Sequence, residues 1–457
     1  MKGVLRKALK RILPGRKDGE EIKKISRRLL IEVGKFADKY GAETILAGSI
    51  TRNTWMKEKK EIDIFVAFPE SVKEDELGNI GLSIGRAAIK SVGGRHTVSY
   101  AQHPYVRGFV GKYQVDIVPC YKLSSADKIK SAVDRTPFHV KYIEKNMRPE
   151  QANDVRLLKQ FCKAAGVYGA DLKTEGFSGY ICDLLIIKYG SFENAINSIA
   201  GWKAGTIITL DSRPVRQKFS SPMALIDPVD PNRNVAAAVS AKSFEALVSR
   251  ADDFCKKPSE KFFFPPEEKP LGRAEFAKLR RSRDAKLIAI VFKPPKVVAD
   301  ILWPQLRRAA ERIDHMLREN DFASMNRDVW SDGKSTGIIL FEMAVHKLPN
   351  VKKRVGPPIF AHSNARNFVA HYMKNSVRRP YIEGINWVAE TERKHTEAAA
   401  YLSELLKAGQ KNLEETGIPS YIAASVSRGF KIAEDEKIYK SARAPGAKIF
   451  LRKFFGG

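Results

Sequence analysis

The sequence has little of what covalent or metal crosslinking requires. Among 457 residues there are four cysteines, and they are far apart, at Cys120, Cys162, Cys182 and Cys255. No two of them have the close spacing of zinc ligands, and four scattered thiols do not make the dense disulfide framework of a small secreted protein. The sequence therefore predicts neither a structural zinc site nor a disulfide-stabilised fold.

Long apolar runs and internal repeats are also missing. No stretch of the sequence reaches the roughly 20 apolar residues that a membrane-spanning helix needs. Residues 1–10 interleave basic and apolar side chains, which is typical of an amphipathic helix and not of a signal peptide. We expect this helix to pack on the first domain, with binding to a membrane surface as the alternative. A cytoplasmic protein with no membrane partner follows as the expectation.

Acidic residues are few beside the basic ones. Aspartate and glutamate number 52 against 80 lysines and arginines, which gives a formal net charge of +28. Such an excess favours a polyanionic partner, because each neutralised phosphate releases counterions. A solvated basic surface would give the same count, so charge alone leaves the question open. The length allows about three domains with sizeable cores.

Two of the acids interrupt an apolar strand predicted over residues 61–66. Side chains at positions i and i+2 of a strand point to the same face, so Glu61 and Asp63 should present two neighbouring carboxylates. Acids in strands often lie at an exposed edge. Paired half-buried carboxylates, however, need a compensating cation, and a hard divalent ion such as Mg²⁺ is the natural one.

A third acid lies in the second strand of a hairpin predicted over residues 106–110 and 113–118. Asp116 there interrupts the run Val115, Ile117 and Val118. Three carboxylates on neighbouring strands are the minimum for two-metal phosphoryl chemistry, in which two ions hold the attacking and leaving oxygens.

A candidate phosphate site precedes the acids. A short strand predicted over residues 44–47 ends in Gly48 and Ser49, and Arg52 follows three residues later. This turn offers backbone N–H groups, a hydroxyl and a guanidinium to a phosphate, and a helix is expected to begin after it. A Gly-Ser turn by itself is more often only a turn, so the inference depends on the acids that follow.

In this order, the Gly-Ser turn, the paired acids and the distant third acid resemble the signature of nucleotidyltransferases of the polymerase-beta superfamily. Further segments are similar to the archaeal, class I CCA-adding enzymes and occur in the order of that family. These enzymes are tRNA nucleotidyltransferases that build or repair the 3′-terminal CCA of tRNA without a nucleic-acid template. The segments lie in about the first half of the chain, at residues 48–55, 103–106, 115–121, 131–139, 156–159, 166–169, 176–180, 227–230 and 233–236.

The resemblance implies an α+β multidomain fold. Its parts would be a polymerase-beta-like nucleotidyltransferase catalytic head over residues 1–150, a helical central (neck) domain that selects the nucleotide over 151–260, and a tRNA-binding remainder over 261–457. This last part would combine an α+β, ferredoxin- or RRM-like body with a helical tail. The run at 262–270, rich in phenylalanine and proline, is the best boundary candidate, and its phenylalanines are expected to anchor a linker rather than stack on bases.

Hydrophobic periodicity predicts elements in each part. Helices are expected over residues 22–36, 155–165, 180–187 and 301–317. Strands are expected over 286–292 and 338–345, with a basic turn at 352–358 after them. A strand–helix–strand unit beside Arg378 and Arg379 suits an RNA-binding platform.

The resemblance also implies site residues, substrates and partners. Mg²⁺ would be held by Glu61, Asp63 and Asp116, which are the catalytic acids of the family. ATP and CTP would be the nucleotide substrates, tRNA the nucleic-acid partner, and a homodimer is plausible. The residues that would bind the nucleotide are Ser49, Arg52, His139, Lys159, Tyr168 and Arg233, the last of them as the reader of the base edge.

Three alternatives stay open on the sequence. A poly(A) polymerase-like enzyme would share the acids and the basic charge but add only A. A small-molecule nucleotidyltransferase would leave the large basic C-terminal third without a use. A non-catalytic RNA-binding protein on the same scaffold would have no need of three costly carboxylates.

Overall fold

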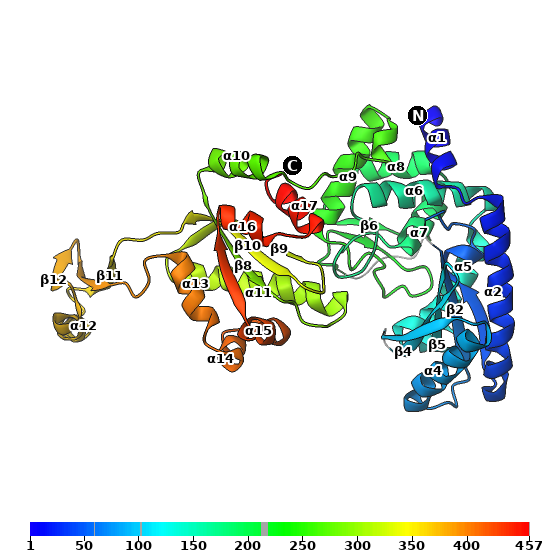
Figure 1. Cartoon of the computed structure of the whole chain (residues 1–457), viewed down its shortest axis with the longest axis horizontal. Coiled ribbons are helices and arrows are strands. Elements are labelled where there is room, and N and C mark those ends of the chain that lie inside the picture. The colour runs from blue at the N-terminus through cyan, green and yellow to red at the C-terminus, as the bar shows by residue number, and fades with distance from the viewer. Residues whose placement is uncertain (59, 101–102, 212–217, 457) are drawn as a thin grey trace. The chain divides into compact units, whose positions relative to one another are not determined.

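The protein is described by a computed structural model that covers residues 1–58, 60–100, 103–211 and 218–456. The chain divides into two compact units, Met1–Pro266 and Glu267–Gly457, coloured blue to green and green to red in Figure 1. The division falls inside the phenylalanine- and proline-rich run. Within the described ranges no helix is both long and apolar enough to cross a membrane.

The sheet of the first unit places the three predicted acids on two adjacent strands. Its strands lie in the order β1 (Glu43–Ala47), β2 (Glu61–Phe68), β5 (Tyr113–Tyr121), β4 (Pro104–Val110) and β3 (Arg95–Tyr100). β2 and β5 are parallel, and the other neighbouring pairs are antiparallel. The strands and the β4–β5 hairpin predicted from the sequence are confirmed.

The two faces of this sheet are covered differently. One face, with Ile62 and Ile64 of β2, packs on helices α2 (Arg16–Ala37) and α4 (Glu74–Ser91). On the other face, α5 (Thr136–Asn146) contributes Val140 to a small core with Phe65. Only one end of that second face is apolar, so polar side chains occupy the remainder. The short helix α3 (Gly48–Thr51) begins at the end of β1.

Helices make up most of the remainder of the first unit. They share one core, and they are α6 (Ala152–Ala164), α7 (Gly179–Tyr189), α8 (Phe192–Ala200) and α9 (Ala241–Lys256), beside the short parallel pair β6 (Thr206–Ile208) and β7 (Met223–Leu225). Phe263 is fully buried there and packs edge-on against Phe161 and Phe254. The phenylalanine run therefore anchors the chain to this core, as expected.

The N-terminal helix α1 (Lys2–Ile12) is amphipathic as predicted, but its packing partner differs from the expectation. Its buried Ala8 and Ile12 belong to the helical core and not to the core beneath the sheet. The periodic spacing of apolar residues identifies which side of a helix is buried, but it does not indicate which part of the protein that side packs against.

The main sheet of the second unit is buried on both faces. Its strands, all antiparallel, lie in the order β14 (Phe430–Glu434), β8 (Lys286–Phe292), β10 (Gly337–Val345) and β9 (Ala323–Ser331). One face packs on α11 (Ala299–Glu319), α13 (Ala398–Leu406), α14 (Gln410–Glu415) and α15 (Ser420–Ser427). The other packs on α10 (Arg273–Arg283), α16 (Glu436–Ser441) and α17 (Pro445–Phe454). Burial on both faces explains why β8 and β10 are continuous apolar runs in the sequence.

A second, three-stranded sheet corrects one expectation. Its strands lie in the order β11 (Val351–Pro358), β13 (Asn386–Glu392) and β12 (Arg378–Glu383), with α12 (His362–Asn375) beside them. The basic turn predicted at residues 352–358 is wrong, because these residues form β11. The backbone of Lys352 and Lys353 is hydrogen-bonded by pairing with β13, although the strand is exposed. Charged residues and prolines in the sequence do not indicate such pairing. Strand β9 was also not predicted.

Candidate active site

The three predicted catalytic acids lie on one face of the first sheet. In the parallel pairing of β2 and β5, Asp63 is opposite Asp116 and Glu61 is opposite Gln114. The residues between them, such as Ile62 and Val115, are buried on the opposite face. Because neighbouring strands are about 4.8 Å apart, the carboxylates of Asp63 and Asp116 project from adjacent positions.

A basic residue on the next strand holds one of these acids. Arg107 of β4 is opposite Asp116 in the sheet, and its Nε and Nη2 donate to the two carboxylate oxygens at 2.8 and 2.7 Å. Nη2 also donates to the hydroxyl of Tyr105 at 2.8 Å. The hydrogen bonds to Asp116 raise the pKa of Arg107 further above its ordinary value. The guanidinium therefore balances the charge of Asp116 in this structure.

The turn after β1 lies directly against the second acid. Gly48 has a φ of +77°, and a Cβ at this position would come within 2.0 Å of Oδ2 of Asp63. Glycine is required here for two reasons. An L side chain would be strained in this backbone region, and it would also collide with the carboxylate. The turn thus brings backbone and Ser49 beside the acids.

The donor set suits a divalent metal such as Mg²⁺, which prefers carboxylate oxygens. Within the described ranges, no three His, Cys, Asp or Glu side chains are already gathered closely enough to hold an ion. The placement of Glu61, Asp63 and Asp116 on one face nevertheless fits such a group, because the side chains could gather by rotation once Arg107 yields its partner.

Two of the predicted nucleotide-binding cations meet at one buried acid. Asp183 of α7 is fully buried, and it forms ion pairs with Nη1 of Arg52 at 2.6 Å and with Nζ of Lys159 at 3.4 Å. Nε of Arg52 also donates to the carbonyl of Gly48 at 2.9 Å. Neither oxygen of Asp183 has a well-aligned hydrogen bond, so the carboxylate is held by charge. One acid between two cations leaves an excess of positive charge beside the Gly-Ser turn.

Tyr168 and Lys159, both predicted to bind the nucleotide, lie close together at the start of α7. A Cβ on Gly179, at the start of α7, would lie 3.2 Å from the hydroxyl of Tyr168 and 3.7 Å from Nζ of Lys159. Burial lowers the pKa of Lys159 and raises that of Tyr168, with Asp183 partly offsetting the effect on the lysine. A buried ammonium group responds strongly to any anion that approaches it.

The turn that carries Ser49 is fastened to α6. Arg156, which is buried, donates from Nε to the carbonyl of Trp55 at 2.9 Å and from Nη2 to Oδ1 of Asn53 at 2.9 Å. Lys159 donates to the hydroxyl of Thr54 at 2.9 Å. The backbone carbonyl of Ser49 accepts from the N–H of Thr54. The turn predicted to bind phosphate is therefore positioned by residues more than a hundred positions later in the chain.

The other two predicted nucleotide-binding residues meet at a second buried acid. His139 of α5 and Arg233 both contact Oδ2 of Asp227, at 2.9 and 2.7 Å. The hydroxyl of Tyr180 donates to Oδ1 of the same carboxylate at 3.2 Å, and its ring stacks on His139 with 4.1 Å between centroids. His139 and Arg233 are thus brought together by an acid that the sequence motif contains but to which it assigns no role.

The first turns of α7 connect these two groups of residues. Tyr180 and Asp183 are three positions apart and therefore neighbours on the helix surface. Tyr180 reaches the acid that holds His139 and Arg233, while Asp183 reaches Arg52 and Lys159. Ser178 precedes the helix and caps it, because its hydroxyl accepts from the N–H of Ile181.

Sequence reasoning missed the supporting residues Arg107, Arg156, Asp183 and Asp227. One signal was present: Asp183 stands inside the apolar helix segment from Ile181 to Ile186, where an acid is costly without a partner. Arg107 interrupts an apolar strand in the same way. Their partners lie far away in the sequence, so the pairings themselves required the fold.

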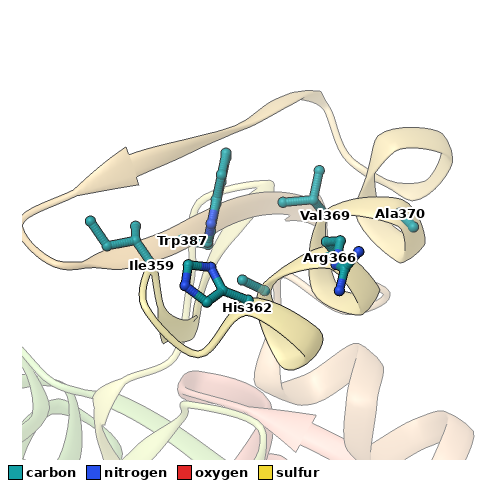
Figure 2. Close-up of a pocket in the computed structure, with 7 residues that line it drawn as sticks. Ile359, His362, Arg366, Val369, Ala370 and Trp387 are labelled. Carbon is teal, nitrogen blue, oxygen red and sulfur yellow. The ribbon is translucent and has the colours of Figure 1, made fainter.

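A surface cavity of about 860 Å³ lies in the second unit and contains none of the predicted site residues. It is formed by α12 and the strands beside it. Figure 2 shows His362 and Trp387 facing the same opening, with Arg366 on the next turn of α12.

Comparison with protein families divides the chain into three matched regions. Residues 27–139 match the model for a nucleotidyltransferase domain. Residues 153–264 match the second domain of tRNA nucleotidyltransferases, and residues 283–435 match the C-terminal domain of CCA-adding enzymes. The sheet with the three acids is therefore part of a nucleotidyltransferase domain of mixed helices and strands.

Curated relatives match over nearly the whole chain. A CCA-adding enzyme of Methanosarcina acetivorans is 37% identical over 98% of this chain and 96% of its own. The corresponding enzymes of Methanothermobacter thermautotrophicus and Archaeoglobus fulgidus are 35% and 36% identical over 93% and 96% of this chain, and over 92% and 95% of their own lengths. The chain therefore belongs to the family of archaeal CCA-adding enzymes, the nucleotidyltransferases that its sequence motifs resemble.

Proposed function

We propose that the protein is a tRNA nucleotidyltransferase that adds and repairs the 3′-terminal CCA of tRNA, using CTP and ATP. The observation that carries the proposal is the register of β2 and β5, which sets Asp63 opposite Asp116 beside the Gly48 turn. Relatives named CCA-adding enzymes that match along the full chain support the choice of substrate.

In this reaction the 3′-hydroxyl of tRNA attacks the α-phosphate of the nucleotide, and pyrophosphate leaves. Glu61, Asp63 and Asp116 would hold Mg²⁺, which, when bound, supplies charge neutralisation to the hydroxyl and the phosphate oxygens. Asp116 would give up its contact with Arg107 to take part. Catalysis then consists mainly of positioning and electrostatic stabilisation.

The nucleotide is expected to lie between the two groups that α7 connects. Ser49, Arg52, Lys159 and Tyr168 would bind the triphosphate through the turn, the cations and the hydroxyl. Of these groups, Lys159 would be stabilised most by the triphosphate, because phosphate oxygens compensate for the desolvation of its buried ammonium group. His139 would donate near the nucleotide.

Arg233 would read the base edge. A guanidinium has only donors, so it complements the acceptors of cytosine and adenine. Its contact with Asp227 occupies Nη1 and leaves other N–H groups for the base.

We assign tRNA binding to the body and tail over residues 261–457, with residues 1–150 as the catalytic head and 151–260 as the central domain. The net charge of +28 supports a nucleic-acid partner. In the second unit, the four-stranded antiparallel sheet with α11 on one face suits the RRM-like body of this proposal. Trp387, His362 and Arg366 around the cavity in Figure 2 combine the aromatic and cationic groups that RNA bases and phosphates favour. A cytoplasmic location and a homodimer complete the proposal.

Purified protein should add C, C and A, and then stop, on tRNA transcripts that lack the 3′ end, in the presence of Mg²⁺. Addition of A alone would indicate a poly(A) polymerase-like enzyme, and indifference to tRNA would indicate a small-molecule substrate. Either result would reject the proposal.

Asp63→Asn tests the role of the acids directly. The variant should lose incorporation by several orders of magnitude while binding tRNA with unchanged affinity, because the RNA contacts are assigned elsewhere. The matched control is Asp75→Asn, which removes an exposed acid from the first turn of α4 in the same unit. Equal activity of the two variants would show that the acid on β2 takes no part in catalysis, as for a non-catalytic RNA-binding protein.

A further inference from the structure

Asp227 is a buried acid at which four donors converge. Its side chain is fully buried, and Oδ2 contacts Nη1 of Arg233 at 2.7 Å and Nε2 of His139 at 2.9 Å. Oδ1 accepts from the hydroxyl of Tyr180 at 3.2 Å and from the N–H of Val229 at 3.1 Å. Every acceptor direction of the carboxylate faces a donor, so its position is fixed from both sides.

The carboxylate is ionised in this environment. Burial alone would raise the pKa of Asp227, but the hydrogen bonds from His139, Arg233 and the N–H of Val229, together with the charge of His139, outweigh burial and lower it. An ionised acid with this set of donors holds a guanidinium in one orientation, since charge-assisted hydrogen bonds are short and directional.

Arg233 needs such support, because little else holds it. Its side chain is 36% exposed, and a long exposed side chain loses considerable rotamer entropy when it is fixed in one place. Fixing that orientation before the nucleotide arrives removes this cost from binding. His139 is held in addition by its stack on Tyr180.

We infer that Asp227, with Tyr180 behind it, is the positioning residue that makes Arg233 discriminate between bases; the inference rests on the proposed function. Cytosine N3 and adenine N1 accept hydrogen bonds, whereas uracil N3 and guanine N1 each carry a hydrogen. An N–H group of Arg233 aimed at this ring position is compatible with C and A and unfavourable for U and G. An arginine that can change rotamer would lose this selectivity, because it can turn toward a carbonyl of uracil or guanine instead.

Asp227→Asn tests the inference through the ratio of correct to incorrect nucleotides. Incorporation is measured with CTP and UTP on transcripts that lack CCA, and with ATP and GTP on transcripts that lack only the final A. Asparagine has one oxygen acceptor, so it cannot satisfy donors on both sides. The ratio of kcat/KM values, CTP over UTP and ATP over GTP, should narrow by about tenfold or more, with the loss for CTP and ATP mainly in KM.

Two further variants separate positioning from folding. Tyr180→Phe removes one donor to Asp227 and keeps the ring on His139, so the ratio should narrow in the same direction by a smaller factor. Asp230→Asn is the matched control, since Asp230 lies in the same loop but pairs with Arg135 at 3.0 Å. Its ratio should equal that of the wild type.

The outcomes distinguish this inference from the proposed function. A wild-type protein that does not prefer C and A would reject the proposed function itself. The positioning role is wrong if the wild type prefers C and A and Asp227→Asn shows the same preference. It is also wrong if Asp227→Asn lowers kcat/KM for all four nucleotides by the same factor. Should Asp227→Asn fail to fold by circular dichroism, Tyr180→Phe decides, and an unchanged ratio in that variant overturns the inference.

Discussion

Arg107 on β4 and Asp116 on β5 face each other across the sheet, and the guanidinium contacts both carboxylate oxygens at 2.8 and 2.7 Å. A predicted metal ligand is thus paired with a protein cation. Arginine and a divalent ion compete for the same oxygens, because a carboxylate that accepts two hydrogen bonds from arginine has few lone pairs left for a metal. Arg107 therefore stabilises the acid in this structure, and we expect it to oppose metal binding.

Arg107→Met should change stability and metal affinity in opposite directions. Without metal, the half-buried Asp116 loses its counter-charge, and the free energy of unfolding should fall by about 1 to 2 kcal/mol, less than for a fully buried pair because Arg107 is 34% exposed. In Mg²⁺ or Mn²⁺ the loss should shrink, because the ion no longer displaces a guanidinium. Urea unfolding with and without metal, together with calorimetric titration of Mn²⁺, measures both effects.

The control for this prediction is Arg86→Met on α4, an exposed arginine of the same unit. It should change neither quantity. A weaker affinity of Arg107→Met for Mn²⁺ would contradict competition and would indicate that Arg107 holds Asp116 ready for the metal.

Gly48 and Gly93 form a matched pair for testing the turn beside Asp63. Their φ angles are +77° and +75°, but a Cβ on Gly48 would lie 2.0 Å from Asp63, whereas a Cβ on Gly93 would meet nothing within 4 Å. Alanine at either position should cost about 1 kcal/mol of backbone strain. Only Gly48→Ala should also abolish nucleotide incorporation, because it displaces the carboxylate.

Unfolding curves and CTP incorporation compare the two glycine variants. Similar activity of the two would show that the close approach to Asp63 has no role in catalysis. Activity lost in both would point to a global effect of strain.

Local sequence patterns predicted the elements that carry the acids. The strand bearing Glu61 and Asp63, the hairpin bearing Asp116 and the strand β8 were all evident, because short runs of mainly apolar residues indicate buried strands. Strand β8 is an unbroken apolar run in the sequence because both of its faces are buried. By contrast, β11 was mistaken for a turn, because its charged and proline residues contribute no buried face.

The supporting contacts of the site could not be predicted from local patterns. Asp183 pairs with Arg52, more than a hundred positions away, and Asp227 pairs with His139 across almost ninety. Such pairings depend on how the central helices pack beside the sheet, and no periodicity encodes that. The residue types were visible in the sequence, whereas the partner of each became evident only in the structure.

Asp183 is expected to be essential for stability. Removing it in Asp183→Leu leaves Arg52 and Lys159 without their buried counter-charge, which should lower the free energy of unfolding by about 3 to 5 kcal/mol. The double variant Asp183→Leu with Lys159→Met replaces a buried charged pair by apolar groups and should recover part of that loss. Urea unfolding of both variants and of Lys159→Met completes a double-mutant cycle. No recovery in the double variant would show that the acid and the lysine are not energetically coupled.

The ion pairs of Asp227 should appear as a pH dependence of stability. Burial would raise its pKa, but the contacts with His139 and Arg233 outweigh burial, so its pKa in the folded protein lies below the ordinary value of 3.8. The unfolded chain therefore takes up a proton first as the pH falls. The stabilisation is complete above about pH 4 and is lost as the pH decreases through the folded pKa. The difference in unfolding free energy between wild type and Asp227→Asn should accordingly shrink as the pH falls below about pH 4. Urea unfolding at successive pH values measures it, and a difference that stays constant into strong acid would mean that the carboxylate is not held by charge.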